Sequence, residues 1–169
     1  VPFGETIPAG FSWFMSLASI PMSSFSRGPE VQPPLAVAGQ NVAVNICYED
    51  VFGEEIIAAL PAAGILANLS NTAWFGHSLA QPQHLQIAQM RASETGRPML
   101  RATNTGMTAV VGADGFVQAA LPAFTQGVLK AEVRAYEGMT PYASFGNLGF
   151  LLLAISFLVI GRLPVRRIR

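Results

Sequence analysis

The residues best suited to chemistry surround the single cysteine of the chain, Cys47, in the run Asn45-Ile46-Cys47-Tyr48-Glu49-Asp50. A lone cysteine cannot form a disulfide within its own chain, so Cys47 is not a structural cross-link. It is either a small buried apolar residue or a nucleophile, because a thiolate attacks carbonyl carbon readily. The polar neighbours that follow it favour the nucleophile.

The elements around Cys47 predict an α/β domain. Near-continuously apolar runs predict strands over 42–47, 65–69, 99–103, 108–111, 116–120 and 128–133, and periodic runs predict helices over 54–60 and 82–95. Ala113-Asp114-Gly115 predicts a hairpin turn. Cys47 ends the first of these strands, and active residues of α/β folds lie at the carboxyl ends of strands.

The composition is more apolar and less charged than that of an average soluble domain. The 169 residues are 51% hydrophobic and 12% charged, where an average soluble domain has roughly 25% charged residues. The formal net charge is zero, which argues against a nucleic-acid partner, because such partners usually require a basic face. The first residue is a valine, so we expect these residues to be part of a longer protein.

A long apolar segment follows the α/β region. Residues 138–161 contain no charged side chain, and the stretch after Tyr142 is long enough, with its lead-in, to predict one transmembrane helix. A buried core helix is the alternative. Residues 162–169 carry four of the ten basic residues, which places this tail in the cytoplasm and residues 1–137 on the opposite side of the membrane.

Several runs, in this order, resemble the apolipoprotein N-acyltransferases of bacteria, a group within the nitrilase or carbon-nitrogen hydrolase superfamily. The resemblance covers essentially the whole chain. It rests on Val1-Pro2-Phe3-Gly4-Glu5, Pro21-Met22-Ser23-Ser24-Phe25-Ser26-Arg27-Gly28, Ile46-Cys47-Tyr48-Glu49, Ser70-Asn71-Thr72-Ala73-Trp74-Phe75-Gly76, Ala102-Thr103-Asn104-Thr105-Gly106 and Gly138-Met139-Thr140-Pro141-Tyr142.

This resemblance implies the C-terminal part of a nitrilase-type α-β-β-α sandwich, followed by the transmembrane helix. It implies an enzyme of the bacterial inner membrane whose catalytic domain is periplasmic. The acyl donor would be a phospholipid, the acceptor the N-terminal amine of a diacylated apolipoprotein, and Cys47 would carry the acyl chain as a thioester. The resemblance implies no cofactor.

The resemblance also gives roles to single residues. Tyr48 and Glu49 occupy positions that the family needs beside the nucleophile, and the Tyr48 N–H is a candidate oxyanion donor. Glu5 corresponds to an active-site glutamate that orients the lysine of a Glu-Lys-Cys triad or gates substrate. The resemblance implies that the triad lysine and the base glutamate both precede Val1. The only lysine present, Lys130, lies too late in the chain to match the family lysine. We therefore expect this chain alone to be inactive.

Aromatic residues are candidates for substrate binding. Trp74 and Phe75 follow a predicted strand end and could shape an acyl pocket, although core packing is an equal alternative. Trp13 and Phe14 belong to an irregular aromatic segment that we expect to dip into the membrane interface and guide lipid.

Two further patterns bear on the site. His77 and His84 lack neighbours at the spacing of zinc ligands, so the sequence predicts no metal site. Arg91, Glu94, Arg97 and Arg101 are expected to form structural ion pairs.

Two other functions remain open. One is a nitrilase-type amide or nitrile hydrolase, in which water would accept the acyl group. The other is a non-catalytic, membrane-tethered remnant.

Overall fold

The computed structural model describes residues 32–162, and its centre is a six-stranded mixed sheet with the order β1-β2-β3-β4-β5-β6. The central strands β2, β3 and β4 run parallel, and the three outer pairings are antiparallel. The strands are β1 (Leu35–Val37), β2 (Gln40–Ile46), β3 (Ile65–Ser70), β4 (Met99–Thr103), β5 (Ala109–Val111) and β6 (Val117–Ala120). The predicted α/β class is therefore confirmed for this part of the chain.

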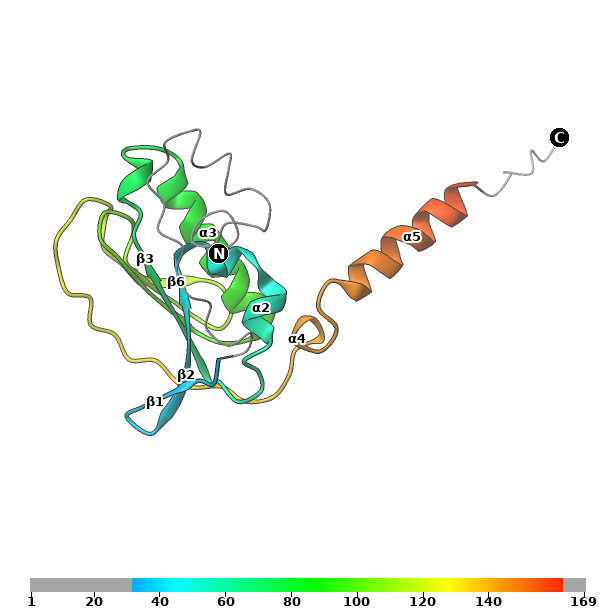
Figure 1. The fold of residues 1–169 in the computed structure, drawn as a ribbon, viewed down its shortest axis with the longest axis horizontal. Coiled ribbons are helices and arrows are strands. Elements are labelled where there is room, and N and C mark those ends of the chain that lie inside the picture. The colour runs from blue at the N-terminus through cyan, green and yellow to red at the C-terminus, as the bar shows by residue number, and fades with distance from the viewer. Residues whose placement is uncertain (1–31, 163–169) are drawn as a thin grey trace, which may run out of the picture.

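Two of the helices cover one face of the sheet, and the others lie at its edges or beyond it (Figure 1). The helices are η1 (Cys47–Val51), α2 (Gly53–Ile57), η2 (Ala73–Phe75), α3 (Ala80–Thr95), α4 (Pro141–Phe145) and α5 (Leu148–Arg162). The two that cover the face are α2 and α3, which Figure 1 shows on the same side of the sheet. The α3 residues Leu85, Ala88 and Ala92 share one face of that helix and join the buried core. Gly96 ends α3 in the left-handed conformation, with φ at 63°.

The two faces of the sheet differ because strand side chains alternate. The face toward α3 carries apolar core residues and then, one step nearer the carboxyl ends, the aligned polar row Asn45, Asn68 and Arg101. The opposite face ends in the paired residues Ile46 and Leu69, which are 52% and 51% exposed. The amino end of this same face is covered, because Val42 and Ile65 are only 8% and 5% exposed. Apolar side chains are therefore left open to solvent only toward the carboxyl end of the face.

The strand predicted over 128–133 is wrong. Residues 121–137 contain no regular element, and Val128 is 83% exposed. The segment runs past the amino end of β3, where the Tyr136 N–H donates to the carbonyl of Gly64. A β-rich sequence without a neighbouring strand edge gains no ladder hydrogen bonds, so its local preference has nothing to stabilise it.

The segment predicted as one transmembrane helix is divided. Gly146, with φ at 53°, and Asn147 separate α4 from α5, and Figure 1 shows α5 extending away from the sheet. The 15 residues of α5 span about 22 Å, less than the roughly 30 Å hydrocarbon core of a bilayer. Across residues 32–162, none of the helices combines the length and apolar character needed to cross a membrane.

Candidate functional site

Cys47 lies where the sequence places it, directly after β2, at the edge where three parallel strands end. It is the first residue of η1, and its backbone has φ at 53°. This left-handed conformation is uncommon for a residue other than glycine. The thiol is partly exposed, and Sγ lies 3.8 Å from the carbonyl oxygen of Asn71, which follows β3. Cys47 is therefore not a buried core residue.

Tyr48 and Glu49 continue the same short helix. The Tyr48 side chain is 48% exposed and packs edge-on against Phe52, with ring centroids 5.5 Å apart. The Glu49 carboxylate accepts a hydrogen bond of 2.6 Å from the N–H of Ile46, so it stabilises the start of η1. The Tyr48 N–H lies in the first turn of η1, where a helix supplies no acceptor of its own.

The loops after β3 and β4 are joined beside Cys47 by a pair of asparagines. The Asn104 amide donates to Asn71 Oδ1 at 2.7 Å. Asn104 Oδ1 accepts from the N–H of Thr72 at 3.0 Å and from that of Thr105 at 2.8 Å. Because side-chain oxygens satisfy these backbone donors, the two loops hold a fixed shape without strand pairing.

A buried polar network lies directly beneath Cys47. The Cys47 carbonyl oxygen accepts from Asn68 Nδ2 at 2.9 Å and lies 3.3 Å from His84 Nε2. His84 Nε2 is also 2.9 Å from Asp50 Oδ1, and Arg101 Nη1 lies 3.3 Å from Asp50 Oδ2. Asp50 and Asn68 are completely buried, and Arg101 is 3% exposed.

Charge and burial oppose each other at Arg101. Burial lowers the pKa of Arg101 from its usual value, while the negative charges of the Asp50 carboxylate and of the Cys47 thiolate act to raise it. The cation therefore lies close enough to Cys47 to interact with it electrostatically. The ion pair expected for Arg101 is present, with Asp50 as its partner, and Arg91 pairs with Glu94 at 2.7 Å. The guanidinium group of Arg97 instead donates to the carbonyl oxygens of Ala63 and Gly138, at 2.8 and 2.7 Å.

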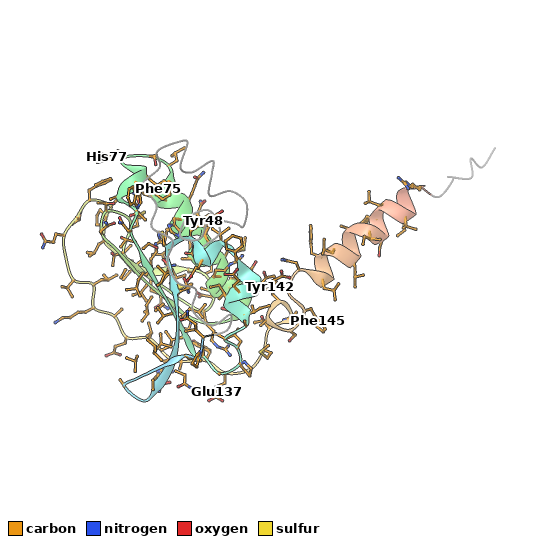
Figure 2. All side chains as sticks on the ribbon, in the orientation of Figure 1. Tyr48, Phe75, His77, Glu137, Tyr142 and Phe145 are labelled. Atoms are coloured by element: carbon orange, nitrogen blue, oxygen red, sulfur yellow. The ribbon has the colours of Figure 1, made fainter. Side chains whose placement is uncertain are left out.

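Exposed aromatic residues lie at the same end of the molecule as Cys47. Trp74 and Phe75 form η2 directly after β3 and are 83% and 47% exposed. The His77 ring stacks on Phe124, with centroids 3.8 Å apart. Figure 2 shows Tyr48, Phe75 and His77 at one end of the sheet and Glu137 at the other. Trp74 and Phe75 are therefore not core residues of the described part of the chain.

A pocket that is open to solvent lies elsewhere in the described part of the chain. Its volume is about 300 Å³, and residues of α2, α3 and α4 line it, among them Arg91 and Tyr142. Cys47 does not line this pocket.

Three predicted site residues, Glu5, Trp13 and Phe14, lie outside the described residues. Between residues 32 and 162, no group of three or more histidine, cysteine, aspartate or glutamate side chains could hold a metal ion.

The polar network beneath Cys47 is not among the sequence predictions. From the sequence, His84 is a candidate only for metal binding, and Asp50, Asn68, Asn71 and Asn104 have no predicted role. One signal was available, because Asn45, Asn68 and Arg101 are polar residues inside apolar strands, and the parallel register aligns them. A polar row on a buried sheet face usually means that those side chains bond to one another.

Comparison with known proteins agrees with the fold. The carbon-nitrogen hydrolase from Helicobacter pylori G27 has a TM-score of 0.53 to this chain at 19% identity, covering 59% of this chain and 42% of that one. At this identity the similarity shows the fold alone.

Sequence relatives are closer. The apolipoprotein N-acyltransferases of Ralstonia nicotianae and Nitrosomonas europaea are 60% and 56% identical to this chain, covering 87% and 91% of it. This confirms the resemblance found in the sequence. The chain covers 29% and 33% of these relatives, so it spans about a third of their length. The sequence profile of the carbon-nitrogen hydrolases matches residues 13–142. The chain therefore belongs to the carbon-nitrogen hydrolase family.

Proposed function

We propose that this chain carries the nucleophile of a membrane-bound apolipoprotein N-acyltransferase. The observation that supports this most directly is the position of Cys47, which is partly exposed at the carboxyl edge of the parallel strands in a sequence 60% identical to such an enzyme. The proposed substrates are a phospholipid acyl donor and a diacylated apolipoprotein acceptor.

The reaction has two acyl transfers. The Cys47 thiolate attacks the ester carbonyl of the phospholipid, and the lysophospholipid alcohol leaves with a proton, so that a thioester remains. The free amine of the diacylglyceryl-cysteine then attacks the thioester, an amide forms, and the thiolate is released as the amine loses a proton. We assign oxyanion stabilisation to the Tyr48 N–H and, by resemblance, proton transfer to a glutamate and charge stabilisation to a lysine outside these residues.

The side chains around Cys47 have separate proposed roles. Glu49 shapes the turn through its bond to Ile46, and Tyr48 faces incoming substrate. Glu5 is proposed to orient the lysine or gate substrate, as the resemblance implies.

Trp74 and Phe75, exposed beside the site, are proposed to contact the acyl chain. Trp13 and Phe14 are proposed to contact lipid at the interface. Replacing Trp74 by serine in the full-length protein should raise the KM for phospholipid. An unchanged KM would remove Trp74 from the substrate site.

The exposed carboxyl end of the second sheet face supports the sandwich architecture. Ile46 and Leu69 are exposed there although their side chains are apolar. We propose that a second sheet of the longer protein packs on this face and completes an α-β-β-α sandwich. In the full-length protein, Leu69 should then resist hydroxyl-radical labelling that modifies it in the isolated chain.

The surface of α5 supports attachment to a membrane. Its large apolar side chains are all more than half exposed, as a lipid-facing helix requires: Leu148, Phe150, Leu151, Leu152, Leu153, Ile155, Phe157, Leu158, Val159 and Ile160. We propose that α5 inserts its apolar side chains into the inner membrane and holds the α/β region of residues 1–137 at the periplasmic surface, the side that the resemblance implies. The double variant Leu151→Asp and Leu158→Asp should float less with phospholipid vesicles.

The central experiment follows the thioester. Full-length protein is incubated with a phospholipid that carries an isotope-labelled acyl chain, and mass spectrometry searches for a hydroxylamine-sensitive acyl group on Cys47. We expect this group in the full-length protein, its transfer to a diacylated lipopeptide, and its absence from Cys47→Ala and from residues 1–169 alone. Release of the acyl group only as free acid would instead favour a hydrolase, and no acylation of Cys47 would contradict the proposal.

A further inference from the structure

The backbone of Cys47 requires support from its surroundings. A residue with a side chain at a φ of 53° is disfavoured, and such a conformation persists only where neighbouring contacts enforce it. No glycine occupies this position. The contacts made by the Cys47 main chain therefore show what holds the nucleophile in place.

Two buried side chains converge on the Cys47 carbonyl oxygen. Asn68 Nδ2 donates to it from β3 at 2.9 Å, and His84 Nε2 approaches it from α3 at 3.3 Å. His84 Nε2 also contacts the Asp50 carboxylate at 2.9 Å. Because a carbonyl and a carboxylate both accept hydrogen bonds, His84 Nε2 carries a hydrogen and donates to both.

The donors are themselves fixed from behind. Asn68 Oδ1 accepts from Arg101 Nη1 at 3.1 Å and from the hydroxyl of Ser70, so its amide group cannot turn over without losing both bonds. Arg101 Nη1 also donates to Asp50 Oδ2. One guanidinium nitrogen therefore links Asn68 to the carboxylate that contacts His84. The set thus joins β3, β4, η1 and α3 around a single carbonyl group.

We propose that His84 and Asn68, supported by Asp50 and Arg101, are positioning residues that hold the Cys47 turn in its left-handed conformation. This rests on the proposed function of Cys47 as the nucleophile. Replacing both members of a buried ion pair by apolar residues often leaves stability unchanged or improves it, so stability is a weak reason for a buried ion pair at this position. Here its hydrogen bonds end on the main chain of the reactive residue.

The single cysteine makes the turn directly observable. Chain labelled with 13C only at cysteine gives one 13Cα and one 13Cβ signal, whose shifts depend on the φ and ψ of Cys47. The spectra are recorded in detergent for His84→Met, which removes the donor, and for His84→Gln, which keeps an N–H group. The matched control is His77→Met, because His77 is the other histidine and stacks on Phe124.

We expect His84→Met to move or split the Cys47 signals, and His84→Gln and His77→Met to leave them near their original positions. In the full-length protein, His84→Met should lower kcat about 10- to 100-fold with KM for phospholipid within about twofold, because misplacing a reacting group costs rate rather than affinity. Unchanged Cys47 signals in folded His84→Met would overturn the proposal, and so would an unchanged kcat.

A second variant, Ser70→Ala, tests the same proposal if His84→Met does not fold. Ser70→Ala removes one bond that fixes Asn68, and it should move the Cys47 signals in the same direction by a smaller amount. No movement in folded Ser70→Ala would also overturn the proposal. If the signals move as expected but the unsubstituted full-length protein transfers no acyl group, the proposed function fails and the positioning network stands.

Discussion

The left-handed backbone of Cys47 predicts that glycine is more stable than alanine at this position. The comparison is between Cys47→Gly and Cys47→Ala, which both remove the thiol and differ by one methyl group. At most positions glycine is the less stable of the two, because it loses more backbone freedom on folding. A φ of 53° should reverse that order.

The size of the reversal follows from two opposing contributions. A residue with a Cβ atom pays roughly 1–2 kcal/mol in the left-handed conformation, and glycine avoids this cost. Glycine pays roughly 0.5–1 kcal/mol more than alanine in lost backbone entropy. The difference leaves Cys47→Gly about 0.5–1 kcal/mol more stable than Cys47→Ala in free energy of unfolding.

Urea unfolding followed by circular dichroism in a mild detergent measures this difference. The matched control is Gln86, an exposed residue inside α3. There the alanine variant should have a free energy of unfolding about 1 kcal/mol higher than the glycine variant. If the alanine variant at residue 47 has a higher free energy of unfolding than the glycine variant, by the same amount as at residue 86, Cys47 is not held in a strained backbone conformation. The reasoning about the turn would then be refuted.

Two further predictions concern buried charges. Asp50→Asn leaves the Arg101 cation buried without its counter-charge and should lower the free energy of unfolding by about 3–5 kcal/mol. The control variant Glu55→Gln, at an exposed residue, should change it little. Equal effects of the two variants in urea unfolding would contradict this prediction. Burial raises the pKa of Glu94 above its usual 4.5, against the opposing effect of Arg91. The folded state therefore holds this proton more tightly, and stability should fall as pH rises from 4.5 through the folded pKa. Glu94→Gln should reduce that fall, and urea unfolding between pH 4.5 and 7 measures it.

The sequence predicted the parts of the fold that depend on local pattern. The strand over 99–103 has the predicted bounds, and α3 begins two residues before its predicted start and ends where Gly96 permits a left-handed cap. These elements carry strong apolar patterns and clear end signals. The position of Cys47 at a strand end was also readable, because β2 is apolar up to that point.

The features that the sequence did not predict depend on contacts between residues far apart in the chain. Residues 128–133 have the composition of a strand but no neighbouring edge, and only the assembled sheet reveals this. The network beneath Cys47 required the register of three strands, which brings Arg101 to Asp50 across 51 positions of sequence. The apolar segment after Tyr142 was read from composition alone, which does not show the break at Gly146.

The long sequence separations within the site also have a consequence for synthesis. Cys47 leaves the ribosome well before Arg101 and Asn104, and at roughly 5–20 residues per second these partners follow several seconds later. During that interval the cysteine has neither its buried ion pair nor the asparagine loops beside it. The left-handed turn at Cys47 would therefore reach its final geometry only when the third parallel strand, β4, joins the sheet.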